Sequence, residues 1–502
     1  MTTPSTPVTF AALVLLLVLS GLDQTILSTT LPSIAASLGG RDLAPWVFSA
    51  YLMASTAAIP LYGKLADRFG TRPLLLASTA LFALGSLACA EADSMRSLVA
   101  ARALQGLGGG GLMTLTMLAI ASLYPLPERG RRMGALGAAF GLSTLAGPLV
   151  GALLLEALPW TWAFLLNIPG ALLALAVLAR ADLGAARAHA LPLDWRGAAL
   201  LSGGLLVLLL AVRSATDEAG GSFLPQALIA ALPTGVSPSL PLLLSAGMML
   251  TAWVIVERRA ADPVVHLALF ARRPFAVVSL LSALSGVMMF AAVVFVPLFL
   301  QQGLGLSPMR SALATLPLML GITIAGQAAG RMLRGGTALS RVAAFAALGL
   351  KLGFALLVAA LHWLPAHGAL PASLGVAVAL APIGLGLGML FPLISVVAQR
   401  SAPPRQLGVA TAMPVMLRAL GGAFGVALFG ELLRHHMASA AAAGLHSQHE
   451  AMLAFAGGTA RIAGFAAAAA MLALVASRGL AGVGKAAPDA TPSTRSIEPE
   501  RI

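Results

Sequence analysis

Fourteen apolar runs, most of them long enough to cross a lipid bilayer, constrain the fold of this chain more than any other feature. Backbone groups in lipid must be hydrogen-bonded internally, and a helix of about 20 apolar residues meets that need while spanning the hydrocarbon core. A soluble chain of 502 residues, 59% of them hydrophobic, could not bury so much apolar surface. The sequence therefore predicts an all-α, polytopic membrane protein with 14 transmembrane helices. The predicted spans are residues 10–30, 46–62, 73–90, 98–122, 133–155, 162–179, 195–212, 240–256, 274–300, 311–327, 342–361, 374–397, 407–433 and 460–477.

The predicted spans fall into groups of six, two and six along the chain. This grouping predicts a six-helix bundle in residues 1–185, a linker with two extra helices in 186–265 and a second six-helix bundle in 266–482. Secondary transporters are commonly built from two such halves, so the middle pair is interpreted as an insertion. Residues 483–502 are rich in Pro, Ser and Thr, and this composition predicts a disordered cytoplasmic tail.

The net charge of +13 does not indicate a nucleic-acid partner, because of where the charges lie. With both termini in the cytoplasm, most of the 31 Lys and Arg residues fall in cytoplasmic loops, helix flanks and the tail. This positive-inside distribution predicts cytoplasmic termini, and the excess of Arg and Ala is typical of a GC-rich bacterial genome. We therefore expect a bacterial cytoplasmic (inner) membrane. The single cysteine, Cys89, excludes an intramolecular disulfide and a cysteine metal site, and no cofactor is expected.

Asp23 is the one carboxylate of the sequence that lies deep within an apolar run. An acid at membrane depth is costly and by default indicates a proton or ion site. Counting about 1.5 Å per residue along each helix places Asp23 and Arg102 at similar depth in the outer half of the membrane. We expect the two to interact in one state and to separate when Asp23 is protonated. The alternative is a permanent structural pair.

A short charged turn separates the second and third predicted spans. Its key residues are Gly63, Asp67, Arg68, Gly70 and Arg72. Asp67 can cap the start of a helix or pair with an arginine, which would hold one side of the protein shut. The run G-K-L-A-D-R-F-G-T-R resembles the cytoplasmic gate loop of major facilitator superfamily transporters, with a threonine in place of one arginine. The alternative is a solvated turn that only fixes topology.

Four glycines and a proline form a pattern on the fifth predicted span. The residues are Gly137, Gly141, Gly147, Pro148 and Gly151. At about 100° per residue the glycines lie within about 120° of one another, so a neighbouring helix can approach closely. Pro148 should bend the span. The spacing resembles the antiporter motif of exporters in the same superfamily, although a glycine stripe can also serve packing alone.

Four further residues are candidates for substrate contact or proton coupling. Gln105 follows Arg102 in a run that resembles the superfamily's fourth-helix motif, and Glu156 is an acid at the outer end of the fifth span. Lys351 lies near mid-membrane, where it would bind an anionic substrate or extend along the helix surface to water. Arg418 is interpreted either as a coupling residue or as a buried cation paired with carbonyls.

Over residues 10–480 the chain resembles the fourteen-helix drug:proton antiporters. The resemblance implies a proton-coupled exporter of lipophilic small molecules that works by alternating access, with the proton gradient as its energy source. A single deep acid suits a cationic substrate. The expected partners are the substrate, protons and the lipid bilayer, while a periplasmic adaptor and an outer-membrane channel stay open. A narrow-specificity metabolite exporter and an uptake symporter of the same fold remain alternatives. No nucleophile, metal or paired-acid constellation favours an enzyme.

Overall fold

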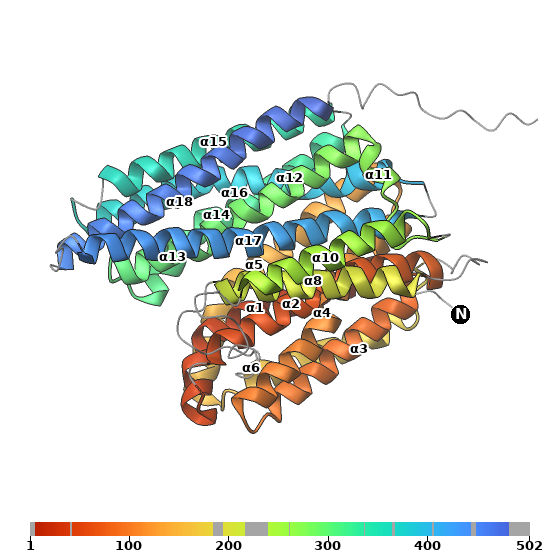
Figure 1. Cartoon of the computed structure of the whole chain (residues 1–502), viewed down its shortest axis with the longest axis horizontal. Coiled ribbons are helices and arrows are strands. Elements are labelled where there is room, and N and C mark those ends of the chain that lie inside the picture. The colour runs from red at the N-terminus through yellow and green to blue at the C-terminus, as the bar shows by residue number, and fades with distance from the viewer. Residues whose placement is uncertain are drawn as a thin grey trace, which may run out of the picture.

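In the computed structural model the chain is a bundle of helices that run along one long axis (Figure 1). Every regular element among the described residues is helical. Eleven of these helices are long and apolar enough to cross a membrane, and the segment Trp162–Leu178 is a shorter apolar helix. The predicted tail 483–502 lies outside the described residues. The structure describes residues 6–40, 43–183, 194–215, 239–260, 262–335, 337–363, 367–403, 406–442 and 448–480.

The first half of the chain packs α1 against α5 and α7, and α4 against α2 and α3. Helix α4 begins at a reciprocal cap, in which Ser94 Oγ accepts from Ser97 N at 3.2 Å and Ser97 Oγ accepts from Ser94 N at 3.1 Å. Such a cap satisfies two backbone donors that would otherwise lack partners. The elements are α1 (Thr6–Leu38), α2 (Ala44–Phe69), α3 (Thr71–Ala90), α4 (Met95–Leu123), α5 (Leu126–Ala157), α6 (Trp162–Leu165) and α7 (Asn167–Leu178).

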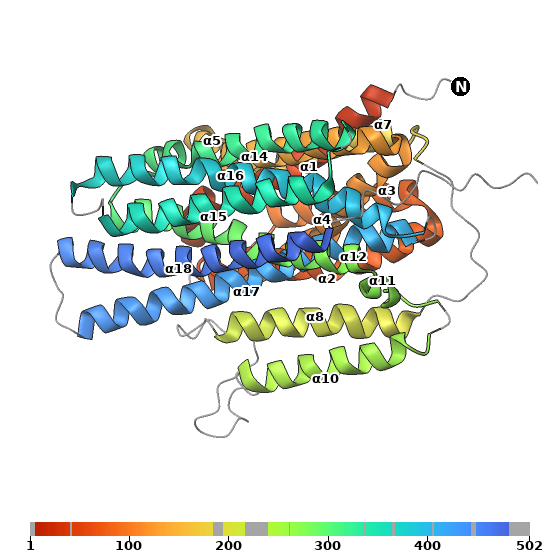
Figure 2. The ribbon, with the colours of Figure 1, turned by 90° about the horizontal axis from the view of Figure 1, so that it is seen from above.

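The middle of the chain contributes a separate pair of helices, α8 (Trp195–Ala215) and α10 (Ser239–Glu257). The two pack against each other along the edge of the bundle (Figure 2). Only α8 of the pair makes extensive contact with the rest of the described helices, against α2 and α17. The pair is therefore joined to both halves of the chain through one helix.

The second half packs α16 against both α14 and α15, and α17 against α12. Between α12 and α14 the helix widens twice into π-helical turns, Ala291–Phe295 and Phe299–Gly303. Pro297 lies between them and has no N–H to donate, which breaks the regular hydrogen-bond ladder. The elements are α11 (Ala268–Ala271), α12 (Arg273–Phe290), α13 (Val296–Leu298), α14 (Pro308–Arg334), α15 (Leu339–Trp363), α16 (Ala369–Arg400), α17 (Leu407–Ala442) and α18 (Gln448–Ser477).

The charged turn predicted between the second and third spans is shorter than expected. Helix α2 continues to Phe69 and α3 begins at Thr71, so Gly70 alone breaks the chain between them. Its φ of 85° lies in the region that favours glycine, because a side chain there would clash with the backbone. Asp67 and Arg68 are thus held on a helix. We call the end of the bundle that contains Gly70 the gate end.

Candidate functional site

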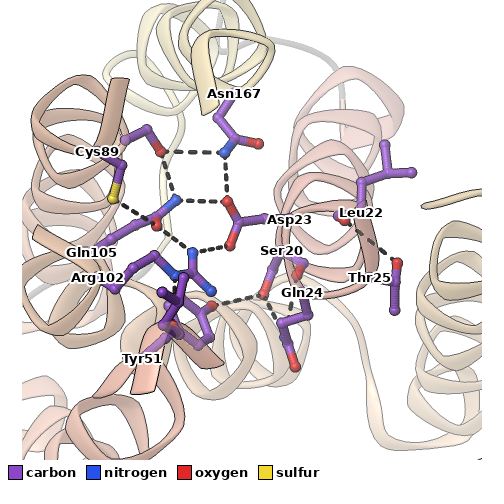
Figure 3. Close-up of polar contacts among 12 residues, drawn as sticks. Ser20, Leu22, Asp23, Gln24, Thr25, Tyr51, Cys89, Arg102, Gln105 and Asn167 are labelled. Atoms are coloured by element: carbon purple, nitrogen blue, oxygen red, sulfur yellow. Dashed lines mark hydrogen bonds and ion pairs between the residues drawn. The ribbon is translucent and has the colours of Figure 1, made fainter. Parts of the chain in front are cut away.

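A buried ion pair joins α1 to α4 in the first half of the chain (Figure 3). Arg102 Nη1 donates to Asp23 Oδ2 at 2.7 Å, and the two residues are 0% and 2% exposed. The structure therefore brings together the two residues whose predicted depths matched. An ion pair so deeply buried is a net benefit only when its remaining polar atoms also find partners.

Amide side chains supply those partners, Gln105 from α4 itself and Asn167 from α7. Gln105 Nε2 and Asn167 Nδ2 donate to Asp23 Oδ1 at 2.7 and 2.9 Å. Both amides also donate to Ser86 Oγ, at 2.8 and 3.2 Å. Both carboxylate oxygens of Asp23 therefore accept hydrogen bonds, one from a guanidinium and the other from two amides.

Arg102 also fastens this network to α2. Its Nε donates to Val47 O at 3.1 Å, and its Cζ lies 4.4 Å from the centroid of the Tyr51 ring. A guanidinium over an aromatic face is attracted by the ring quadrupole. Arg102 therefore connects Asp23 of α1 to the backbone and to an aromatic side chain of α2.

At the gate end, Asp67 of α2 caps the first turn of α17. Its Oδ1 accepts from Gly408 N at 2.6 Å and its Oδ2 accepts from Val409 N at 3.1 Å. A carboxylate at a helix N-terminus satisfies unpaired backbone donors and meets the positive end of the helix dipole. Gly63 allows this approach, since a Cβ there would lie 2.6 Å from Ala412 Cβ. Asp67 thus links the two halves of the chain.

A second glycine crossing closes the same end between α5 and α14. A Cβ on Gly330 would lie 2.6 Å from Gly130 O, so these backbones touch without intervening side chains. The remaining gate residues face other partners: Arg72 donates to Ala179 O, and Arg68 lies 5.7 Å from the centroid of the Phe69 ring. The gate end is therefore sealed by α2 against α17 and by α5 against α14.

A cavity of about 990 Å³ lies between the two halves. Its wall is mainly apolar and rich in methionine and phenylalanine from both halves, for example Met133, Phe140, Met319 and Phe391. Methionine is flexible and polarizable, so such a wall adapts to differently shaped apolar molecules. The volume and the wall fit a lipophilic small molecule.

The cavity extends away from the gate end. Its lining includes Gln301 and Ser311, which lie within a few residues of the ends of their helices at the opposite end of the bundle. Pro297, between the two π-helical turns, also lines it. This widened segment was not predicted from the sequence, although Pro297 within an apolar run was a signal for it. The lining of the cavity therefore reaches the end of the bundle opposite Gly70.

The glycine pattern of α5 serves two surfaces instead of the single helix approach expected. A Cβ on Gly151 would lie 2.9 Å from Ile26 O, and Gly147 faces Thr25, so these two glycines pack against α1. Gly137 and Gly141 instead line the cavity. Helix α5 continues without interruption across Pro148, and the bend expected there stays a prediction.

The three remaining charged candidates lie apart from the Asp23 network. Glu156 is exposed near the end of α5, and Lys351 is exposed on α15 and does not line the cavity. Arg418 of α17 lies beside the cavity wall, where its Nη2 is 3.1 Å from Met113 Sδ. The carbonyl partners considered for Arg418 do not occur among its contacts with described residues.

A buried polar cluster at the gate end was not anticipated. Lys64 of α2 forms an ion pair with Asp262, and the two residues are 4% and 8% exposed. Glu257, at the end of α10, accepts from Val265 N in the same region. Burial and then the Lys64 ammonium lower the pKa of His266, so its ring should be neutral near pH 7. The cluster ties α2 to the segment that joins α10 and α11.

Substitution of Lys64 by methionine is expected to destabilise the protein by about 3–5 kcal/mol, because Asp262 would stay buried without its counter-ion. The measurement is thermal unfolding of the purified protein in detergent. Lys64→Met with Asp262→Leu removes both charges and should recover most of the lost stability. A single variant as stable as the parent would show that the pair is solvated.

Comparison with known proteins agrees with this architecture. The sequence profile of the Major Facilitator Superfamily matches residues 13–426. Multidrug transporter protein MdtP of Bacillus subtilis (strain 168) is 30% identical over 426 residues, covering 84% of this chain and 74% of that protein. Multidrug resistance protein 3 of the same organism is 30% identical over 327 residues, covering 65% of this chain and 61% of that protein. The chain thus spans less than two thirds of the latter's length.

A solved structure shows the same fold. The proton:xylose symporter XylE superposes with a TM-score of 0.60 at 18% identity, covering 92% of this chain and 94% of that chain. The family match and the apolar helices together show a multi-pass membrane transporter, and members of this family are not enzymes. The chain belongs to the Major Facilitator Superfamily, and its relatives include a multidrug transporter protein and a multidrug resistance protein.

Proposed function

We propose that this chain is a proton-coupled exporter of lipophilic small molecules that works by alternating access. The observation that carries the proposal is the buried Asp23–Arg102 pair beside a cavity between the two halves. An intramembrane acid paired with a cation is a common element of proton relays. Fourteen spans are proposed as well, with α2, α5 and α6–α7 added to the eleven apolar helices.

The proposed orientation follows from the positive-inside rule, which puts the gate end and both termini in the cytoplasm of a bacterial cell. The described conformation is then the outward-facing one. Export needs no cofactor in this scheme, since the proton gradient supplies the energy. A periplasmic adaptor and an outer-membrane channel are not part of the proposal.

Helix α2 provides the proposed link between proton binding and the gate. A proton on Asp23 cancels its charge and weakens its hold on Arg102, which contacts Val47 and Tyr51 of α2. About 30 Å further along the same helix, at about 1.5 Å per residue, Asp67 holds the gate against α17. A shift of α2 would therefore weaken the gate contact, open the cytoplasmic side and release the proton there.

The direct test is transport in proteoliposomes whose lumen corresponds to the cell exterior. We expect an acid lumen to drive uptake of a lipophilic probe, and a protonophore to abolish that uptake. Pyrene-1-sulfonate and (1-pyrenylmethyl)trimethylammonium are suitable probes because they share one ring system. Accumulation driven by an alkaline lumen instead would indicate symport. Accumulation of the probe that does not depend on the pH gradient would contradict proton coupling.

A further inference from the structure

The cavity contains no free acid to attract a cation. Among the residues that line it in the described part of the chain, Arg102 alone carries a full charge, and Asp23 neutralises it. Asp23 itself is 2% exposed and lies behind Arg102. The expectation of a cationic substrate depended on an available deep acid. The geometry removes that basis, because in this conformation the carboxylate is already fully engaged.

A cation that has no counter-ion among the described residues lies beside the cavity instead. Arg418 stands in α17, where its Cζ is 4.7 Å from the centroid of the Phe391 ring and its Nη2 donates to Met113 Sδ at 3.1 Å. A thioether sulfur is a weak acceptor. Within the described residues no carboxylate forms an ion pair with Arg418. A guanidinium whose partners among the described residues are a ring and a sulfur retains most of its capacity to bind an anion.

Arg418 lies in the wall of a small hollow next to the main cavity. Arg418 lines a small hollow together with Met117, Phe391 and Ser395, and these three residues also line the main cavity. The Ser395 hydroxyl is 3.9 Å from Met117 Sδ, which leaves it able to turn towards a stronger acceptor. A hydroxyl donor and a free guanidinium therefore converge on one side of a wall that is otherwise apolar.

We propose that Arg418 binds the anionic head group of an amphipathic substrate, of the carboxylate, sulfonate or phosphate class, whose apolar body occupies the methionine- and phenylalanine-rich cavity. The inference rests on the proposed export function and names its substrate class. Arg418 presents a planar set of donors that matches such head groups in two-point geometry. The apolar body gains from leaving water.

Binding of an anion would also change a contact between the two halves. Met113 belongs to α4 and Arg418 to α17, so their contact bridges the halves on the cavity floor. An anion is a much stronger partner for a guanidinium than a thioether, and it would draw Arg418 away from Met113. Substrate binding would thereby loosen one bridge between the halves, as alternating access requires of a transported substrate.

The test compares gradient-driven uptake of pyrene-1-sulfonate and (1-pyrenylmethyl)trimethylammonium in proteoliposomes, with the membrane potential clamped at zero by potassium and valinomycin. The wild-type chain should favour the sulfonate, and Arg418→Gln should lower sulfonate uptake about tenfold or more, as expected for loss of one charge-assisted pair. Arg418→Lys should fall between them, because it keeps the charge without the planar fork. Lys351→Gln, which removes an exposed cation outside the cavity, should behave as the wild type.

The outcomes separate this inference from the proposed function. Gradient-driven uptake of the ammonium probe without uptake of the sulfonate would overturn the anion site and leave proton-coupled export intact. Unchanged sulfonate uptake by Arg418→Gln would also overturn the anion site. Uptake of neither probe by the wild-type chain would count against both. Ammonium uptake retained by Arg418→Gln would show that this variant is folded. The preference of the wild-type chain for the sulfonate over the ammonium probe is measured without any substitution and so does not depend on the folding of a variant.

Discussion

Asp23→Asn is expected to reduce gradient-driven transport to the level of protein-free vesicles while leaving substrate exchange at equal pH intact. Asparagine keeps the size of the side chain and one acceptor oxygen, so the amide contacts to Gln105 and Asn167 can persist in part. It cannot bind a proton in exchange for substrate. The variant would therefore move substrate down its own gradient and lose the ability to concentrate it.

The measurement loads proteoliposomes with unlabelled probe and follows entry of labelled probe, once at equal pH and once with an acid lumen. Asp93→Asn is the matched control, because Asp93 is an exposed acid just before α4 and outside the network. We expect the control to retain both activities. Gradient-driven accumulation by Asp23→Asn would mean that another group carries the coupled proton.

Asp67→Asn is expected to open the gate end. The carboxylate accepts two backbone N–H bonds from the start of α17, and an amide can accept through one oxygen and lacks the charge that meets the helix dipole. Loss of about 2 kcal/mol from such charge-assisted contacts would shift a two-state equilibrium by about 30-fold. The variant should populate the gate-open state far more than the parent does.

Cysteine labelling measures this shift, because the native Cys89 is fully buried and gives little background. Ala412→Cys places a thiol at the crossing of α2 and α17, where Ala412 is 0% exposed. A membrane-impermeant maleimide applied from the gate end should label this thiol about 30-fold faster in the Asp67→Asn background. Equal labelling rates in the two backgrounds would show that Asp67 does not hold the gate.

The buried pair was open to prediction from the sequence, because a charge in an apolar helix is rare and depth follows from residue counting. Counting residues along their helices was enough to predict that Asp23 and Arg102 lie at the same depth. Their partners were harder to predict. Ser86 and Tyr51 are ordinary residues of apolar helices, and nothing in their own segments shows that α2 and α3 place them beside Arg102. Such contacts depend on helix rotation, which packing decides.

At the gate end, too, the role of a residue could be predicted from the sequence but its partner could not. The charges of the turn predicted a cap or an ion pair for Asp67, and the cap is confirmed, but the sequence did not identify Gly408 as its partner. That partner lies 341 residues away in another helix. The predicted length of the turn was wrong, because the segment from Gly63 to Phe69 carries charges and is nevertheless helical. Charge marks an end of a membrane span without marking the end of the helix.

The measurement that tests the central claim most directly is proton release on substrate binding. The purified chain is placed in weakly buffered detergent solution near neutral pH, and the pyrene probe that it transports is added while the pH is recorded. We predict that the wild-type chain releases protons on binding and that Asp23→Asn releases none, with probe binding to both verified by fluorescence. Equal release from the two proteins would contradict coupling through Asp23, and no release from a wild-type chain that binds the probe would contradict proton exchange altogether.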